Sequence, residues 1–542
     1  MGGQIDAHHG PSALAEDALG VEGTEGRSSL GPAASQSVAL LLAAGLFTAA
    51  ALAAIWSVRF LPMQDYPQHL LQAHIVGAVH ADNLDFSSHF DARLRVAPYV
   101  TFYAVAAALA RVLPIEVAGK LAVSLYVLAV AGMVFQLVLR GGGDALRGRG
   151  WGGGWGLLLF FPFMFSQAYY LGMINYLYSL PLLVMALVDH ERLGKGPVRW
   201  WIWCRQVLWL AALFLTHPFT YLVYVGLALG GACLSVRRPS ECLRGLVAPV
   251  LAAGFFVVWM LTHDGESMGP GSPKWLSWQE NLAFYGYLFT GMRWFDGVDK
   301  LSVLVWSGVA VVVGRGLLAA RGDGPDRLDR YLLYFALASL AVFVLPFRVK
   351  MGNENWHHVN LRLAPLAMFF LAMIVGRLRF TGGWAVALVA LVALAMGQSL
   401  LKQRRISAEI EQIAPVVEEM APNAVVLPLV FDHETPQLDA IFFDVHLHDH
   451  NYYHLRVGGG VNPYLFSHEL MPVQYRPRAV RPAPPSYRPE RFTWARHAAD
   501  YRYLLIRKPA FVSEAYDAFL ARLAERTRRV KSSGPWVLLE VR

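Results

Sequence analysis

Repeated apolar runs of about 20 residues constrain this chain more than any other feature of its sequence. A helix of that length is long enough to cross the hydrocarbon core of a bilayer. Apolar residues make up 55% of the 542 residues, and charged residues make up only 16%. The composition therefore excludes an ordinary soluble enzyme, and the runs predict a polytopic α-helical membrane protein.

Short loops rich in arginine and lysine indicate how the spans are oriented. The loops at 140–150 and 189–200 carry such residues, and the positive-inside rule assigns them to the cytoplasm. If the short apolar segment 97–113 crossed the membrane, loop 140–150 would lie outside, so the rule favours an interfacial or re-entrant helix there. We expect about eleven spans in the plasma membrane, with the N-terminus cytoplasmic and the C-terminus extracytoplasmic. They are predicted at 38–56, 117–139, 151–166, 171–188, 201–216, from the turn at 217–218 to 236, and at 246–261, 301–319, 331–346, 363–376 and 384–400.

The chain divides into three parts. Residues 1–36 lack periodicity and are rich in Gly, Ala, Ser and acidic residues, which predicts a disordered tail. Residues 37–400 are expected to form the transmembrane domain. Residues 401–542 contain no span and predict a soluble α/β domain. Its expected elements are an amphipathic helix carrying Ile406, Ile410, Ile413 and Val417, a helix at 511–526, an extended proline-rich loop at 472–489, and strands at 423–431, 501–507 and 535–541.

Charge and cysteine content narrow the function classes further. The net charge of +8 does not indicate a nucleic-acid partner, because much of it lies in short loops where it sets orientation. The three cysteines all lie within or beside predicted spans, so no disulfide framework can be read.

A candidate site follows the first span, in the segment LPMQDYPQHLLQAH at 61–74. Asp65 lies between two prolines, and His69 and His74 follow it. Prolines fix φ and remove backbone donors, so we expect a shaped loop here, within a longer loop over 61–96. An acidic group at the membrane edge suggests a site facing the outer compartment. The alternative is a plain interfacial turn.

Two further outer segments concentrate polar residues. The loop at 263–300 begins HDGESMGPGSPKW, and the loop at 348–362 carries Arg348, Lys350, Glu354, His358 and Arg362. Arg362 stands at the mouth of a predicted span, where a guanidinium must snorkel or find an anion. A lipid phosphate would satisfy it, since Arg suits bidentate anion contacts. Each cation taken alone could instead be a headgroup anchor. We expect the three outer segments to meet over one cavity.

Histidines also cluster in FFDVHLHDHNYYH at 442–454. On a strand, His446, His448 and His450 would share one face. Their spacing matches no specific zinc signature, so a hydrogen-bonded structural role is favoured over a metal site. No Walker A motif, dinucleotide glycine fingerprint or nucleophile elbow is present.

These features together resemble the GT-C glycosyltransferases. Asp65 in MQDYPQH matches the acidic position of their first outer loop, and 99–128 is similar to the interfacial helix and second-span entry of bacterial lipid-linked sugar transferases. The resemblance covers nearly the whole chain as architecture. The family often has two adjacent acidic residues, whereas Gln64 and Tyr66 flank Asp65, so no cofactor is assigned and a divalent cation stays open.

The resemblance implies an inverting transfer of a sugar from a polyprenyl-phosphate donor to a lipid or glycan acceptor. Asp65 would be the base, and His69 would orient it or share the role. Arg362, Arg348 and Lys350 would bind the donor phosphate, with His74, His358 and Glu354 as further substrate contacts. Two rival classes remain, a non-catalytic scaffold for envelope polysaccharide assembly and a transporter. A transporter should bury ionisable groups within its spans, and these spans almost lack them.

Overall fold

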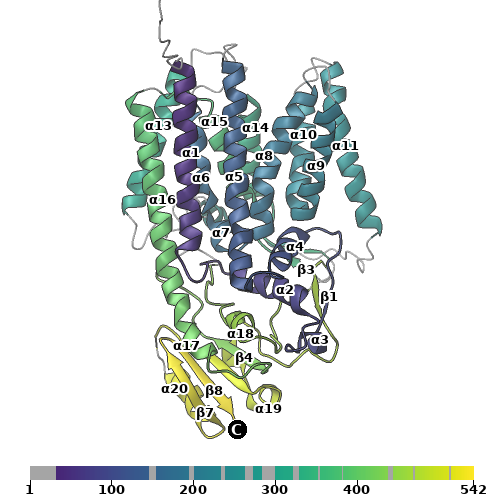
Figure 1. Cartoon of the computed structure of the whole chain (residues 1–542), viewed down its shortest axis with the longest axis vertical. Coiled ribbons are helices and arrows are strands. Elements are labelled where there is room, and N and C mark those ends of the chain that lie inside the picture. The colour runs from purple at the N-terminus through teal and green to yellow at the C-terminus, as the bar shows by residue number, and fades with distance from the viewer. Residues whose placement is uncertain are drawn as a thin grey trace, which may run out of the picture.

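The computed structural model is a bundle of helices with a smaller α/β domain at one end (Figure 1). It describes residues 32–145, 154–194, 200–233, 239–262, 273–283, 300–320, 329–351, 354–380, 382–437, 443–467, 470–511 and 514–542. The predicted tail at 1–36 lies almost wholly outside the described residues, as do His263, Asp264 and Glu266 of the second outer loop.

Five helices in the described part of the chain are long and apolar enough to cross a membrane. They are α1 (Pro32–Trp56), α5 (Ile115–Ala145), α11 (Pro239–Thr262), α13 (Lys300–Ala320) and α16 (Gly383–Ile410). Shorter apolar helices lie beside them, namely α4 (Val100–Leu109), α9 (Trp200–Thr216), α10 (Pro218–Cys233), α14 (Asp329–Val344) and α15 (Leu363–Val375). These helices indicate a multi-pass membrane protein, but the predicted count of about eleven spans is not confirmed.

One predicted span has a different structure from the one expected, whereas the segment 97–113, which the sequence places at the interface, is short. The segment 151–166 is not one helix, because its described part divides into the 3-10 helix η1 (Trp155–Leu159) and the short helix α6 (Phe160–Met164). After them come α7 (Gln167–Tyr170) and α8 (Ile174–Gly194). The segment 97–113 forms only the ten residues of α4, about 15 Å at 1.5 Å per residue, which is too short to cross a bilayer.

A buried carboxylate joins three helices at the end of the bundle away from the C-terminal domain. Asp189 near the end of α8 is fully buried. Its Oδ1 accepts from Arg140 of α5 at 3.1 Å, its Oδ2 accepts from the indole N–H of Trp209 at 2.8 Å, and Arg205 of α9 forms an ion pair with it. Arg140 of a predicted cytoplasmic loop and Arg205 of a predicted span thus converge on one carboxylate.

The first outer segment is more regular than the predicted loop over 61–96. Tyr66 to Ala78 form the helix α2, with Pro67 in its first turn, where a proline costs no hydrogen bond. The short helix α3 (Phe86–His89) and the strand β1 (Phe90–Ala92) follow. Figure 1 shows α2, α3 and α4 at the end of the bundle that faces the C-terminal domain.

No break separates the bundle from the C-terminal domain. Helix α16 continues past residue 400 to Ile410, and η3 (Glu411–Ile413) and α17 (Ala414–Val417) extend it. The predicted domain boundary at 401 therefore falls inside a helix. The amphipathic face is confirmed, because its four apolar members at 406, 410, 413 and 417 are all buried.

The C-terminal sheet has the order β4-β6-β8-β7. Strands β4 (Val426–Val430), β6 (Tyr503–Arg507) and β8 (Trp536–Val541) and helix α20 (Glu514–Ala524) confirm the four elements expected there, while β7 (Thr527–Ser533) was not predicted. The pair β4–β6 is parallel, and β8 is antiparallel to both β6 and β7. Alternate residues of the central strands face opposite sides. One side joins the core of the bundle, and the other packs with Tyr516, Phe519 and Leu523 of α20.

The segments between β4 and β6 fold back over α2. They contain α18 (Asn451–Arg456), β5 (Val473–Tyr475), η4 (Pro489–Arg491) and α19 (Trp494–His497). Strand β5 pairs antiparallel with β1, so the predicted surface loop at 472–489 begins as a strand fixed to the first outer segment. The remaining strands, β2 (Val349–Met351) and β3 (Glu354–Trp356), form a hairpin before α15.

Candidate functional site

Asp65 lies at the junction between the bundle, α2 and the C-terminal domain. It directly precedes α2 without a side-chain capping hydrogen bond, and its backbone N–H donates to the carbonyl of Leu171 at 3.2 Å. The preceding residue, Gln64, pairs in the same way with Tyr170 at 2.8 Å. Gly172 allows this approach, because its φ is +81° and a Cβ there would come within 2.8 Å of the Asp65 nitrogen.

The carboxyl of Asp65 has the properties of an acid–base group. Its side chain is 26% exposed. Burial raises the pKa of Asp65 to about 7, with a smaller increase from Asp444, and the Gln64 side chain opposes the rise. A carboxyl with a pKa near neutrality is well suited to exchange protons at physiological pH.

The C-terminal domain supplies neighbours of Asp65 that the sequence did not reveal. His448 Nε2 lies 3.5 Å from Asp65 Oδ1. The amide of Gln64 donates to Asp65 at 3.4 Å, and its oxygen accepts from the backbone N–H of Asp444 at 2.7 Å. His448 and Asp444 are distant from Asp65 in the sequence, so no local spacing could have identified them.

The histidine-rich segment does not form the strand that would align its alternate residues. Residues 445–450 form turns that lead into α18, and all three of the alternating histidines are buried. His446 Nδ1 lies 2.7 Å from Asp449 Oδ2, and its Nε2 lies 3.5 Å from Glu409 Oε2 of α16. Burial acts to lower the pKa of His446, but these two carboxylates together raise it. His446 therefore ties the C-terminal domain to the end of α16.

His69 and His74 both lie on α2 but have different surroundings. His69 Nδ1 is 2.7 Å from the hydroxyl of Tyr103 on α4, and its ring packs against Phe466. Its backbone N–H donates to the carbonyl of Asp65 at 3.0 Å, in the first turn of α2, and its orienting role stays a prediction. His74 packs edge-on against Phe86, away from these groups, and burial lowers its pKa to about 4.

Arg362 begins α15 and lies among aromatic and histidine side chains. Tyr176 donates its hydroxyl proton to the Arg362 carbonyl. The Arg362 charge acts on His217 and His358, and it helps burial to lower the pKa of His358 to about 3. Within the described part of the chain, Arg362 Nε is buried without a hydrogen-bond partner, although the side chain as a whole is only partly buried. A partly buried cation in these surroundings favours an anionic ligand.

The second and third outer segments meet through their backbones. Lys274 and Arg348 form an antiparallel bridge, with hydrogen bonds of 2.9 and 3.1 Å. The amide of Asn360 also donates to Asn281 Oδ1 at 2.9 Å. The backbones of Lys350 and Glu354 lie in β2 and β3, but their side chains lie outside the described part of the structure.

The first outer segment reaches the third through the segment 166–176. This segment holds Asp65 by its carbonyls on one side and Arg362 by Tyr176 on the other. A small hollow, with a cavity volume of about 10 Å³, lies between the segment and the start of α15. It is lined by Gln167, Ala168, Leu171, Met173, Leu361, Ala364 and Pro365. Asp65 and Arg362 thus both form hydrogen bonds with the segment 166–176.

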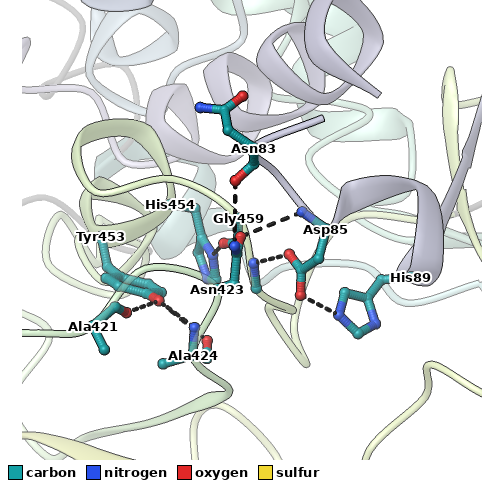
Figure 2. A network of polar contacts seen from close by, with 10 residues as sticks. Asn83, Asp85, His89, Ala421, Asn423, Ala424, Tyr453, His454 and Gly459 are labelled. Carbon is teal, nitrogen blue, oxygen red and sulfur yellow. Dashed lines mark hydrogen bonds and ion pairs between the residues drawn. The ribbon is translucent and has the colours of Figure 1, made fainter. Parts of the chain in front are cut away.

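A polar network fastens the first outer segment to the turn at 458–460 (Figure 2). Asp85 accepts from the backbone N–H of Gly460 at 2.6 Å and pairs with His89 at 2.9 Å. Asn423 accepts from the Asp85 backbone N–H at 3.3 Å, and His454 Nδ1 bonds the carbonyl of Gly459 at 2.8 Å. The network fixes the C-terminal domain against the loop after α2, and so helps to place His448 beside Asp65.

Among the described residues, no group of three or more His, Cys, Asp or Glu side chains is placed to hold a metal ion. No metal site is therefore assigned to the described residues.

Comparisons with known proteins give little further information. No protein-family model matches the chain, and no curated protein does either. Among solved structures, the chain is similar to the apo crystal structure of ArnT from Cupriavidus metallidurans, at 12% identity. The match covers 94% of this chain and 98% of that one, with a TM-score of 0.38. At that identity and TM-score the likeness carries no argument about function.

Proposed function

We propose that this chain is a membrane glycosyltransferase of the GT-C type. It would move a sugar from a polyprenyl-phosphate donor to a lipid or glycan acceptor at the outer face of the plasma membrane. The observation that carries the proposal is the carboxyl of Asp65, which is partly exposed, has a pKa of about 7 and lies where the helical bundle meets the C-terminal domain. Such a group can accept a proton from a hydroxyl at neutral pH.

In the proposed reaction, ionised Asp65 takes the proton of the acceptor hydroxyl as its oxygen bonds the anomeric carbon. The bond from that carbon to the phosphate oxygen breaks, and its electron pair leaves with the polyprenyl phosphate. Direct displacement inverts the anomeric carbon. Phosphate is already a good leaving group, so the step needs no general acid.

Arg362 is the proposed partner of the donor phosphate. Its guanidinium is partly buried at the start of α15, and no carboxylate among the described residues neutralises it, so the phosphodiester anion of the donor would complete its contacts. Charge that develops on the leaving group would strengthen this contact in the transition state. Arg348, joined by its backbone to Lys274, lies on the same loop and would add positive charge. Membrane lipids around the bundle would accommodate the prenyl chain.

The decisive experiment is sugar transfer in vitro from a polyprenyl-phosphate sugar, with purified Asp65→Asn compared with the wild type. The amide keeps the shape and removes the proton acceptor, so we expect a loss of about 10² to 10⁴ in rate. Asp82→Asn, an exposed carboxylate in the same outer segment, is the matched control and should retain activity. Transfer by Asp65→Asn at the wild-type rate would reject the catalytic role of Asp65, and the absence of transfer by the wild type would favour the scaffold or transporter.

The pH dependence provides a second readout. The base must be ionised, and the pKa of Asp65 is about 7, so kcat/KM should rise tenfold per pH unit below about 7 and level off above it. An ordinary carboxylate would already be ionised at pH 5. A profile that is flat from pH 5 to 8 would therefore exclude Asp65 as the base.

A further inference from the structure

We infer that His448 is a positioning residue for Asp65: its Nε2, which carries the ring proton, lies against the carboxyl and favours the ionised, proton-accepting form. This inference rests on the proposed function only in treating Asp65 as the base. Its structural basis is a series of polar contacts, from Gln68 on α2 to His448 of the C-terminal domain and from His448 to Asp65.

The series of polar contacts begins at Gln68, which is fully buried on α2. Its Nε2 lies 2.8 Å from the backbone carbonyl of Tyr464. A carbonyl oxygen can only accept, so the group that faces it must be the amide NH₂. This contact fixes the orientation of the amide, which geometry alone often leaves ambiguous.

The next contact in the series involves the same nitrogen. Gln68 Nε2 lies 3.1 Å from His448 Nδ1. An amide NH₂ can only donate, so Nδ1 must present its lone pair. A neutral imidazole carries one proton, which must then sit on Nε2. That nitrogen is the one that lies 3.5 Å from Asp65 Oδ1.

The surroundings keep His448 neutral. Burial, followed by the nearby His450, His69 and His433, holds the pKa of His448 well below its usual value. Asp65 therefore faces a neutral N–H donor rather than an imidazolium ion. The other groups that act on the Asp65 carboxyl are Gln64, which favours its charged form, and Asp444, which disfavours it.

Two aromatic groups complete the surroundings of the carboxyl. Tyr103 of α4 and Tyr487 of the proline-rich loop both lie close enough for the charge of Asp65 to act on their hydroxyls. His448 and Gln64 each offer Asp65 a donor within 3.5 Å. Gln64 is adjacent in sequence, whereas His448 is present only when the C-terminal domain is docked.

The test compares two substitutions that differ in where they place an amide. In His448→Gln the side-chain nitrogen can reach the position of Nε2, whereas in His448→Asn it reaches only the position of Nδ1. The readout is the pH titration of the Asp65 carboxyl by infrared difference spectroscopy, with its band assigned through Asp65→Asn. His450→Asn, a buried histidine of the same turn that bonds Asn462 instead, is the control.

We expect His448→Asn to raise the titration midpoint of Asp65 by about one pH unit, a tenfold change in proton affinity. His448→Gln and His450→Asn should leave the midpoint close to that of the wild type. In the transfer assay the acidic limb of the pH profile should move with the midpoint. An unchanged midpoint in folded His448→Asn, or equal shifts in the Asn and Gln variants, would overturn the inference.

A measurement on the wild type covers the case in which the variants fail to fold. In protein labelled with ¹⁵N-histidine, the nitrogen shifts of His448 report which ring nitrogen carries the proton. We expect the Nε2–H tautomer, and a proton on Nδ1 would contradict the series of polar contacts. Neither spectroscopic readout needs a transferase assay. If they hold while no sugar is transferred, the proposed function fails and the Asp65–His448 pair stands.

Discussion

The carboxylate of Asp85 accepts a 2.6 Å hydrogen bond from the backbone N–H of Gly460, which joins the loop after α2 to a turn of the C-terminal domain. Gly458, Gly459 and Gly460 all have positive φ, and a Cβ at Gly459 would lie 1.5 Å from Asn423 Oδ1. The domain contact therefore depends on a backbone that other residues rarely adopt.

Gly459→Ala should weaken this contact. The left-handed backbone and the clash with Asn423 together should cost about 2 to 4 kcal/mol, measured as a lower Tm of the purified protein in detergent. Gly383→Ala on α16 is the control, because no atom lies within 4 Å of its Cβ position. It should be neutral or slightly stabilising. Equal Tm values for Gly459→Ala and the wild type would show that the turn is not under this constraint.

Asp189→Asn should destabilise the far end of the bundle. The substitution leaves Arg140 and Arg205 partly buried without their counter-charge, at a cost of about 3 kcal/mol. The effect should appear as a lower Tm and a reduced yield in membranes. Asp82→Asn, which removes an exposed carboxylate, should change neither. A Tm for Asp189→Asn like that of the wild type would mean that the three helices do not rely on this carboxylate.

The two ends of the bundle should lie on opposite sides of the membrane. Helix α5 ends at Ala145, away from the C-terminal domain, which carries Ser532 on β7 (Figure 1). In a cysteine-free background, a membrane-impermeant maleimide should label Ser532→Cys in intact spheroplasts and Ala145→Cys only after permeabilisation. Labelling in the reverse order would overturn the predicted orientation. Labelling of both sites in intact spheroplasts would contradict the transmembrane arrangement itself.

Arg362→Ala should impair both donor binding and turnover. It removes a proposed phosphate contact that strengthens as charge develops on the leaving group, so KM for the donor should rise and kcat should fall by about 10² or more. Arg379→Ala, an exposed arginine beyond the other end of α15, is the matched control and should leave both constants unchanged. Unchanged donor KM in Arg362→Ala would remove the phosphate site from the proposal.

The sequence by itself determined the membrane class and much of the secondary structure. Long apolar runs predict helices wherever they occur, because the signal is local and repeated, and α1, α5, α11, α13 and α16 follow it. The buried face of Ile406 and Ile410 and the strands β4, β6 and β8 are likewise local patterns. Broken segments such as η1 and α6 were missed, since their composition is apolar but their backbone hydrogen bonding is not that of one continuous helix.

Only the tertiary structure decided what surrounds Asp65. The sequence singled out this residue because an acidic group beside prolines at a membrane edge is unusual. It could not show that His448 and Asp444 approach it, because those contacts depend on how the turn after β4 packs on α2. The convergence of Arg140 and Arg205 on Asp189 has the same origin. Contacts between distant segments are set by packing and by the pairing of buried polar groups, which sequence spacing does not record.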